Sequence, residues 1–150
     1  MPAPKRLVAP DPREITYHVM RQILQEHTAV WNSRIPDLTK PQLVVMTALA
    51  RNPGIDQVTT SRLALVDTAT LGGVVLRLEK RGLIARDPDP EDRRRYLLRL
   101  TDEGKATLRS AGKKALKLDA ELLARLEPDE QQQLFDLLTK LSTPRPAETK

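Results

Sequence analysis

The chain has 150 residues, no cysteine and a formal net charge of +5 at neutral pH. Without cysteine it cannot form a disulfide, a thiolate metal site, a cysteine nucleophile or a thiol redox sensor. The positive charge suggests an anionic partner, and the lack of a signal-peptide pattern or of an apolar run of about 20 residues predicts a cytoplasmic protein with no membrane partner.

The composition favours helices around a small aliphatic core. Aromatic residues make up only 3% of the chain, and strong helix formers such as leucine and alanine are frequent. We expect a mainly α-helical fold with a small β-sheet of two to three strands, and one domain over residues 11–141. A flexible N-terminal arm, residues 1–10, and a flexible tail, residues 142–150, are expected at its ends.

The first predicted helix begins with Asp11 as N-cap and Pro12 in its first turn, and it ends at about Arg34. Its apolar residues gather along one face. They are Ile15, Val19, Met20, Ile23, Leu24, Val30 and Trp31. Pro36 stops this helix.

Two shorter helices are predicted next. The first begins at a Thr39 cap with Pro41 in its first turn, and it ends at the RNPG stop signal of residues 51–54. The other is expected over about residues 60–66. A tight turn at residues 67–68 follows it.

Residues 69–81 are expected to form a helix whose apolar positions follow the i, i+3, i+4, i+7 pattern of a core-facing helix and which ends at Gly82. Short strands are predicted at residues 83–86 and 95–100. The loop DPDPEDRR, which carries arginines at its tip, connects them.

The C-terminal part is predicted to form two more helices. A Thr101-Asp102 cap begins a long helix that reaches about Leu126, and Pro128 begins the last one. On the long helix, apolar residues at alternating steps of three and four predict a seam suited to a coiled-coil-like partner. The seam residues are Leu108, Ala111, Ala115, Leu118 and Leu122.

Two short helices, a turn and a hairpin with a cationic tip are the elements of a winged helix-turn-helix. An α-helix fits the DNA major groove, and arginine is favoured in a narrow minor groove, which a thin ribbon can reach. From Arg77 to Arg99 there are eight basic and five acidic residues, a small excess, so this interpretation depends on where the arginines lie. An ordinary solvated charged loop is the alternative.

Two motifs carry a family resemblance. The segment DRRRYLLRLT at residues 92–101, followed by Gly104, resembles the MarR family signature D-x-R-x5-L-T-x2-G. The segment RLEKRGLI at residues 77–84 resembles the end of that family's recognition helix and the start of its wing. The resemblance extends over about residues 12–141.

This resemblance implies a homodimeric transcriptional regulator that binds a pseudo-palindromic operator in double-stranded DNA. The winged helix-turn-helix would span about residues 38–100, between dimerisation helices at about 11–35 and 102–141. By the resemblance, Asp92 would orient the wing and Arg94 would enter the minor groove. The other candidate DNA-binding residues are Thr68, Ala69, Thr70, Gly73, Arg77, Arg93 and Arg95.

Gly72 and Gly73 depart from the family pattern, which carries larger polar residues there. Two glycines inside a helix cost about 1 kcal/mol each relative to alanine. We interpret them as allowing close approach of the backbone to the duplex, so that the protein recognises DNA shape more and base edges less. The alternative is that the helix simply tolerates the destabilisation. Leu76 on the exposed face is unexplained.

The family resemblance also implies a small aromatic carboxylate as effector, bound between the dimerisation helices and the DNA-binding lobe. The candidate ligand-binding residues are Tyr17, His18, Arg21, His27 and Trp31. The segments HTAVW at residues 27–31 and DTATLGGVV at residues 67–75 are similar to the MarR subgroup that governs the breakdown of nicotinate and related aromatic acids, which suggests a hydroxylated pyridine carboxylate or a similar acid. The alternative is that His27 and Trp31 only pack in the core or in a subunit interface.

Other classes of protein fit the sequence less well. An enzyme is not expected, because the chain lacks a phosphate-binding glycine loop and an evident acid–base pair. No cofactor or metal is expected: His18 and His27 are nine residues apart and face different ways on one helix. The remaining alternative to a ligand-responsive repressor is a non-inducible winged-helix module that shapes DNA or binds protein.

Overall fold

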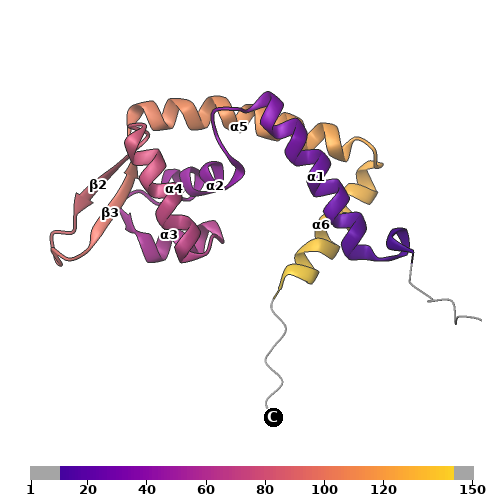
Figure 1. The fold of residues 1–150 in the computed structure, drawn as a ribbon, viewed down its shortest axis with the longest axis horizontal. Helices are drawn as coiled ribbons and strands as arrows, with labels where there is room; N and C mark the ends of the chain where they lie inside the picture. The colour runs from indigo at the N-terminus through magenta and orange to yellow at the C-terminus, as the bar shows by residue number, and fades with distance from the viewer. Residues whose placement is uncertain (1–10, 144–150) are drawn as a thin grey trace, which may run out of the picture. The chain divides into compact units, whose positions relative to one another are not determined.

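The computed structural model describes residues 11–143 (Figure 1). It is mainly helical with one small antiparallel sheet, which confirms the predicted fold class. The chain divides into two compact units, Met1–Ala115 and Leu116–Lys150, and the boundary falls inside one helix. The predicted arm at residues 1–10 and most of the predicted tail lie outside the described residues.

The described elements are named in chain order. They are η1 (Pro12–Glu14), α1 (Thr16–Arg34), α2 (Lys40–Arg51), β1 (Ile55–Asp56), α3 (Gln57–Ala64), α4 (Thr68–Lys80), β2 (Ile84–Pro88), β3 (Tyr96–Leu100), α5 (Asp102–Leu123) and α6 (Pro128–Ser142). No helix within residues 11–143 is long and apolar enough to cross a membrane.

The N-terminal helix begins later than predicted. The Asp11 side chain accepts a hydrogen bond from the Arg13 backbone N–H at 2.9 Å, and the turn that it caps is the short 3-10 helix η1. Ile15 then adopts an extended conformation with φ −100° and ψ 109°, so α1 starts at Thr16. The continuous helix expected from Asp11 was wrong because the Asp-Pro cap serves this separate turn.

Side-chain N-caps set where α2 and α3 begin. Thr39 and Gln42 form the reciprocal capping box of α2, as the Thr39 cap predicts. Asp56 caps α3 by accepting the Thr59 backbone N–H at 2.7 Å, so α3 begins three residues before the predicted start at residue 60. Leu65 ends α3 with a left-handed φ of 52°.

The core of the first unit is aliphatic, as the composition predicts. Helices α2 and α4 contribute most of it, and the start of β2 and the inner face of β3 complete it. Its fully or almost fully buried residues include Leu38, Val45, Met46, Leu49, Leu71, Val74, Val75, Leu78, Leu98 and Leu100. Trp31 is the one aromatic side chain buried among the described residues.

The sheet has three strands in the order β1–β3–β2, all antiparallel. In the β2–β3 hairpin, Ile84 pairs with Leu100 and Pro88 with Tyr96. Strand β1 is two residues long, and no segment was predicted for it, because so short a strand has no alternation to detect. Its pairing joins the hairpin directly to the start of α3.

The first turns of α5 are fastened to the end of α4. Gly82 follows α4 with a φ of +68°, as expected of a glycine after a helix. The Thr101 hydroxyl donates to the Gly82 carbonyl at 2.6 Å, and the Thr101 backbone N–H donates to the Leu83 carbonyl at 3.1 Å. Gly104 touches that same carbonyl, because a Cβ added at Gly104 would lie 1.9 Å from the Leu83 oxygen.

The second unit contains the end of α5 and α6. Glu127 and Glu130 form a capping box at the start of α6, with Pro128 in its first turn. Large apolar side chains of this unit are strongly exposed. They are Leu116, Phe135, Leu137, Leu138 and Leu141, with exposed fractions from 43% to 73%.

Candidate nucleic-acid interface

The N-terminus of α4 presents exposed backbone and hydroxyl groups. Asp67 caps the helix by accepting the Thr70 backbone N–H at 2.8 Å. Hydrogen bonds from Thr70 lower the pKa of Asp67 below its usual value, so the cap is a carboxylate at neutral pH. Thr68, Ala69 and Thr70 are all exposed. The first turn of a helix is a ready-made site for phosphate.

Two glycines, Gly72 and Gly73, leave the middle of α4 without side chains. Gly73 lies beside the Arg77 guanidinium, whose Nη2 atom would be 3.5 Å from a Cβ at that position. Gly72 faces Gln57 of α3 instead, at 3.7 Å from its Nε2 atom. Arg77 therefore folds back along the helix over the glycine, and Leu76 beside it is 49% exposed.

The wing tip is a braced turn. Asp92 accepts the Arg94 backbone N–H through its side chain at 3.0 Å and the Arg95 backbone N–H through its carbonyl at 2.8 Å. Below the turn, the buried Asp89 closes the loop by donating its backbone N–H to the Arg95 carbonyl at 3.0 Å. The side chains of Arg93 and Arg94 are exposed at the tip, and no ion pair holds either of them within the described residues.

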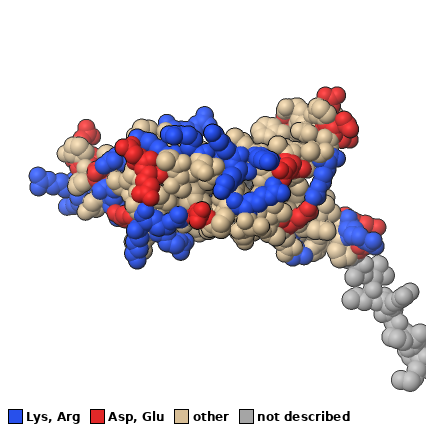
Figure 2. Space-filling view, turned by 90° about the horizontal axis from the view of Figure 1, so that it is seen from above, with Lys and Arg blue, Asp and Glu red and all other residues tan. Residues whose placement is uncertain are grey.

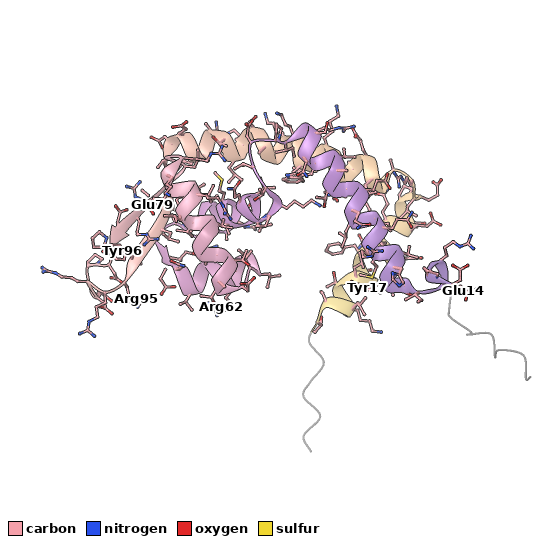
Figure 3. The ribbon with its side chains drawn as sticks, in the orientation of Figure 1. Glu14, Tyr17, Arg62, Glu79, Arg95 and Tyr96 are labelled. Atoms are coloured by element: carbon pink, nitrogen blue, oxygen red, sulfur yellow. The ribbon has the colours of Figure 1, made fainter. Side chains whose placement is uncertain are left out.

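Arg95 has a different position from its two neighbours. Its guanidinium forms an ion pair with Asp56, the N-cap of α3, and lies 3.9 Å from Asp89. The wing is thereby fastened to the helix-turn-helix at its base. Figure 3 shows where Arg95 and Tyr96 lie on the wing. Sequence reasoning missed Asp56, although an aspartate three residues before Thr59 is an N-cap signal.

Further contacts hold the hairpin against α4. Arg86 lies 3.8 Å from Glu79 and stacks over the Tyr96 ring at 5.5 Å from its centre. Arg99 pairs with Asp87 across the hairpin at 2.6 Å. Between wing and α3 lies a groove of about 360 Å³. Its lining residues are Asp56, Gln57, Val58, Arg86, Arg94, Arg95, Tyr96 and Leu98.

The candidate effector residues of α1 fall into two groups. Tyr17 and His18 pack edge to face, with ring centres 5.6 Å apart, near the start of the helix, and Arg21 is exposed one turn later. His27 and Trp31 lie at the other end, with ring centres 6.2 Å apart. Trp31 is 5% exposed and donates its indole N–H to the Leu38 carbonyl at 2.7 Å, so it also fastens α1 to the start of α2.

Lys40 is a further member of the cluster around Trp31, and it was not predicted from the sequence. Its ammonium lies 6.0 Å from the centre of the Trp31 ring and donates to the Thr28 hydroxyl at 2.9 Å. Burial lowers the pKa of Lys40, because the charged form loses hydration. No group of three His, Asp or Glu residues within 11–143 could hold a metal ion.

The predicted dimerisation seam is already partly covered inside the protomer. Ala111 and Leu118 are 7% and 3% exposed, and Leu108, Ala115 and Leu122 are half-buried. By contrast, the apolar face of α1 is open along much of its length. Its exposed members are Tyr17, Val19, Ile23 and Leu24, with exposed fractions from 40% to 66%.

We predict that Asp56→Asn makes folding less sensitive to acid. Hydrogen bonds from Thr59, with a smaller effect of Arg95, lower the pKa of Asp56 from 3.8 to about 2. Because the folded pKa lies below the unfolded one, the Asp56 charge stabilises the fold above about pH 4 and ceases to do so as pH falls to about 2. Its side chain is 18% exposed, so this contribution is at most about 2 kcal/mol.

Urea unfolding at pH 6 and at pH 3 measures that contribution. Asparagine is nearly as good an N-cap as aspartate, so Asp56→Asn removes the charge and keeps the cap. The variant should lose less stability between the two pH values than the parent does. Asp11→Asn, at the exposed cap of η1, is the matched control, and equal losses in parent and Asp56→Asn would contradict the role given to Asp56.

The sequence and the fold are both similar to those of known transcriptional regulators. The model of the MarR family matches residues 38–96, which include α2 to α4, β2 and the wing loop up to the first residue of β3. The transcriptional regulator HosA of Escherichia coli O111:H- is 43% identical over 129 residues, which are 86% of this chain and 96% of that protein.

Two solved structures are similar over almost the whole chain. The PcaV transcriptional regulator of Streptomyces coelicolor, in complex with its natural ligand, is 38% identical with a TM-score of 0.86 and covers 91% of this chain and 97% of that one. BpsR of Bordetella bronchiseptica, whose DNA binding is regulated by 6-hydroxynicotinic acid, is 31% identical with a TM-score of 0.86. That match covers 92% of this chain and 100% of BpsR.

Proposed function

Because the chain belongs to the MarR family of transcriptional regulators, we propose that it is a repressor that binds a pseudo-palindromic operator as a homodimer and leaves it when a small aromatic acid binds. The observation that carries the DNA-binding part is the wing. Two exposed arginines, Arg93 and Arg94, stand at the tip of a turn that Asp92 and Asp89 brace, beside the exposed first turn of α4.

This arrangement supports a division of roles along the interface. Thr68, Ala69 and Thr70 meet phosphate and base edges in the major groove. Gly73 leaves room for the Arg77 guanidinium along α4, and that cation contacts the DNA backbone. Arg94 enters the minor groove, where narrow stretches attract arginine. Arg95 also holds the wing through its ion pair with Asp56, and its side chain remains half exposed toward the same surface.

The effector proposal rests on the cluster at the end of α1 and on the two ligand-associated relatives. A carboxylate would pair with the partly buried ammonium of Lys40, and its ring would pack against Trp31 and His27. The Lys40 ammonium is half-buried, so salt screens its attraction to a carboxylate less than it would for a fully exposed lysine. The similarity to BpsR favours a pyridine carboxylate of the 6-hydroxynicotinate kind.

The test is direct. DNA from upstream of the gene that encodes this chain is bound by the purified protein in fluorescence anisotropy, and 6-hydroxynicotinate, nicotinate and hydroxybenzoates are titrated into the complex. Footprinting on the same DNA shows which bases the protein covers. A footprint confined to one palindrome, together with release of the protein by one of these acids, supports the proposal. Sequence-independent binding that none of the acids disturbs would support the architectural alternative instead.

Lys40→Met is expected to reduce effector sensitivity by about tenfold, because a charge-assisted hydrogen bond contributes about 1.5–3 kcal/mol. Methionine keeps most of the apolar stem, so packing against Trp31 should persist. Operator affinity without effector is expected to stay within about twofold of the parent. The concentration of acid that releases half of the bound operator measures the effect, and an unchanged value would remove Lys40 from the site.

Homodimer formation is supported by apolar side chains that the protomer leaves uncovered. Phe135 of α6 is 67% exposed, so changing it does not open the protomer core. Leu118 is buried, and its replacement would report on folding as much as on association.

Phe135→Asp is therefore expected to weaken the dimer by at least about tenfold, because burying an aromatic side chain contributes about 2 kcal/mol and a buried charge adds a penalty. Sedimentation equilibrium measures the dissociation constant. Gln133→Asp, on the same helix and exposed, is the control for added charge, because it leaves the side-chain hydrogen bond of Gln132 to Asp136 in place. A dimer as tight as the parent's would exclude this face of α6 from the interface.

A further inference from the structure

The first half of α5 carries a row of cations on its outer side. Lys105, Arg109 and Lys113 follow one another at intervals of four residues, so they lie along one side of the helix, and Lys114 is adjacent. We call these four residues the α5 cationic face. Lys105 lies 3.2 Å from Asp102, whereas no acidic side chain among residues 11–143 pairs with Arg109, Lys113 or Lys114.

The spacing of these cations disfavours the isolated helix. Like charges four residues apart destabilise an α-helix, and this row contains two such pairs without a compensating acid at the intervening turns. A solvated face usually alternates its signs instead. The pattern therefore indicates a surface that meets an anion.

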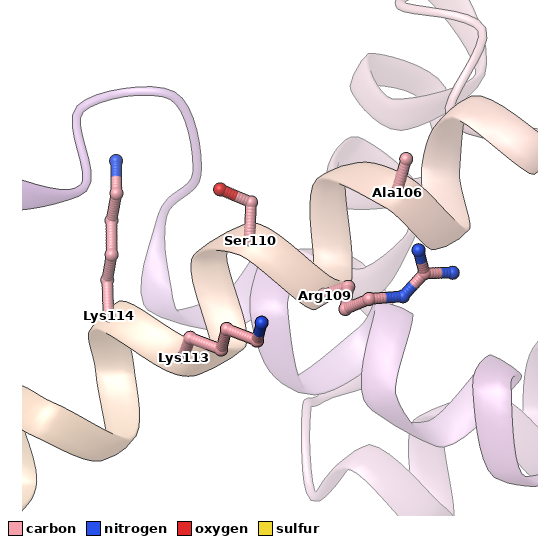
Figure 4. Close-up of a pocket in the computed structure, with 5 residues that line it drawn as sticks. All are labelled: Ala106, Arg109, Ser110, Lys113 and Lys114. Atoms are coloured by element: carbon pink, nitrogen blue, oxygen red, sulfur yellow. The ribbon is translucent and has the colours of Figure 1, made fainter.

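The surface has a shape that suits close approach. A groove of about 420 Å³ runs along it, lined by Ala106, Arg109, Ser110, Lys113 and Lys114. Figure 4 shows these side chains projecting from successive turns of α5, with the small Ser110 between Arg109 and Lys114 and Ala106 at one end of the row. Figure 2 looks onto this side of the molecule and shows Lys and Arg side chains gathered there. Asp37 borders an adjoining groove and marks the edge of the cationic area.

The α5 cationic face lies far from the proposed operator contacts. The start of α5 is fastened to Gly82 and Leu83, beyond the C-terminal end of α4. The operator contacts are at the other end, and the 13 residues of α4 span about 20 Å. Within the first unit, α5 runs along one side, and α3 and the wing tip lie on the opposite side (Figure 1). One straight duplex cannot reach both.

We propose that the α5 cationic face binds a second segment of duplex DNA, so that the operator-bound protein joins two duplexes. Successive cations of the row are about 6 Å apart along the helix axis. A duplex carries a negative charge for about every 1.7 Å of its axis, so the row meets phosphates whatever the sequence. An acidic protein fits less well, because the centres of protein interfaces are enriched in aromatic side chains and depleted of lysine, and this face has the reverse composition.

The inference goes beyond the proposed function, and a two-duplex capture assay tests it. Bead-bound DNA from upstream of the chain's own gene is saturated with protein, and a fluorescent duplex of unrelated sequence, about 60 base pairs long, is added so that it can span the whole face. The parent should capture the second duplex. Arg109→Gln/Lys113→Gln/Lys114→Gln should capture at least about tenfold less, and its salt dependence should flatten by about 0.9 in log–log slope for each phosphate that the variant no longer neutralises.

Two controls make the outcome decisive. Arg109→Lys/Lys113→Arg/Lys114→Arg keeps the charges and should capture the second duplex as the parent does. Affinity for the bead-bound DNA, measured separately by anisotropy, should change less than about twofold in both triple variants. The inference is overturned if the parent captures no second duplex, if the glutamine variant captures as much as the parent, or if it loses the first duplex equally. Failure of operator binding in the parent itself would instead count against the proposed function.

Discussion

Arg94→Ala is expected to weaken operator binding by about ten- to a hundredfold, the loss of about 1–3 kcal/mol that follows when a base-contacting arginine is removed. Arg94 is exposed at the tip, and its backbone N–H is held by the Asp92 side chain at 3.0 Å. Because the turn is fixed before binding, the arginine enters the minor groove at little cost in conformational freedom. Asp92→Ala should therefore reproduce part of the loss without removing any cation from the DNA interface.

The salt dependence of operator binding distinguishes the charge of Arg94 from the shape of its guanidinium. Removing one phosphate-neutralising cation should reduce the slope of log affinity against log salt by about 0.9. Arg94→Lys should restore that slope and still bind more weakly than the parent, since lysine lacks the planar fork of arginine.

Arg99→Ala is the matched control for Arg94→Ala, because Arg99 belongs to the same hairpin but pairs with Asp87 at 2.6 Å. Arg99→Ala should leave the operator affinity within about twofold of the parent's and the slope of log affinity against log salt unchanged, as expected when only an exposed ion pair is lost. If Arg94→Ala bound as tightly as the parent at every salt concentration, the wing would have no part in DNA binding.

The sequence predicts those parts of this protein that depend on short-range signals. Caps such as Thr39, the glycine after α4 and the alternation in β3 each act within a few residues, so the helix order and the hairpin could be predicted. The start of α3 was misplaced because Asp56 was not recognised as an N-cap. Strand β1 was not located because its only support is pairing with a strand about forty residues later.

The candidate site shows the same division between local and distant contacts. That arginines gather at the wing tip follows from the sequence, but that Arg95 turns back to Asp56 does not, because the partners are 39 residues apart. Lys40 was missed for a related reason. On the sequence it belongs to the first turn of α2, and contacts such as the hydrogen bond from Trp31 to Leu38 hold that turn against the end of α1 in the fold.

Gly104 shows how a residue of the family signature can serve the fold rather than DNA. It lies in the first turn of α5 and touches the backbone of Leu83, the residue that joins Gly82, after the end of α4, to the start of β2. Thr101, three residues earlier, uses both its backbone N–H and its hydroxyl at the same place. This junction sets how the recognition helix α4, the hairpin and α5 meet.

Gly104→Ala is accordingly expected to destabilise the protein by about 3 kcal/mol, at the upper end for overpacking. The added Cβ would lie 1.9 Å from the Leu83 carbonyl oxygen and 2.9 Å from its carbon. Both are backbone atoms, so no side-chain rotation relieves the contact, and α5 must separate from the start of β2. A fall in melting temperature of about 10 °C should follow for a chain of this length.

Gly112→Ala, eight residues further along the same helix, is the matched control, since a Cβ there would meet nothing within 4 Å. It should raise stability by about 0.5–1 kcal/mol, because alanine is the better helix former. Opposite signs for the same substitution on one helix would show that contact with Leu83, rather than helix propensity, requires glycine at position 104. Equal effects at both positions would mean that α5 can move off Leu83 at little cost, and the junction would then not fix the recognition helix.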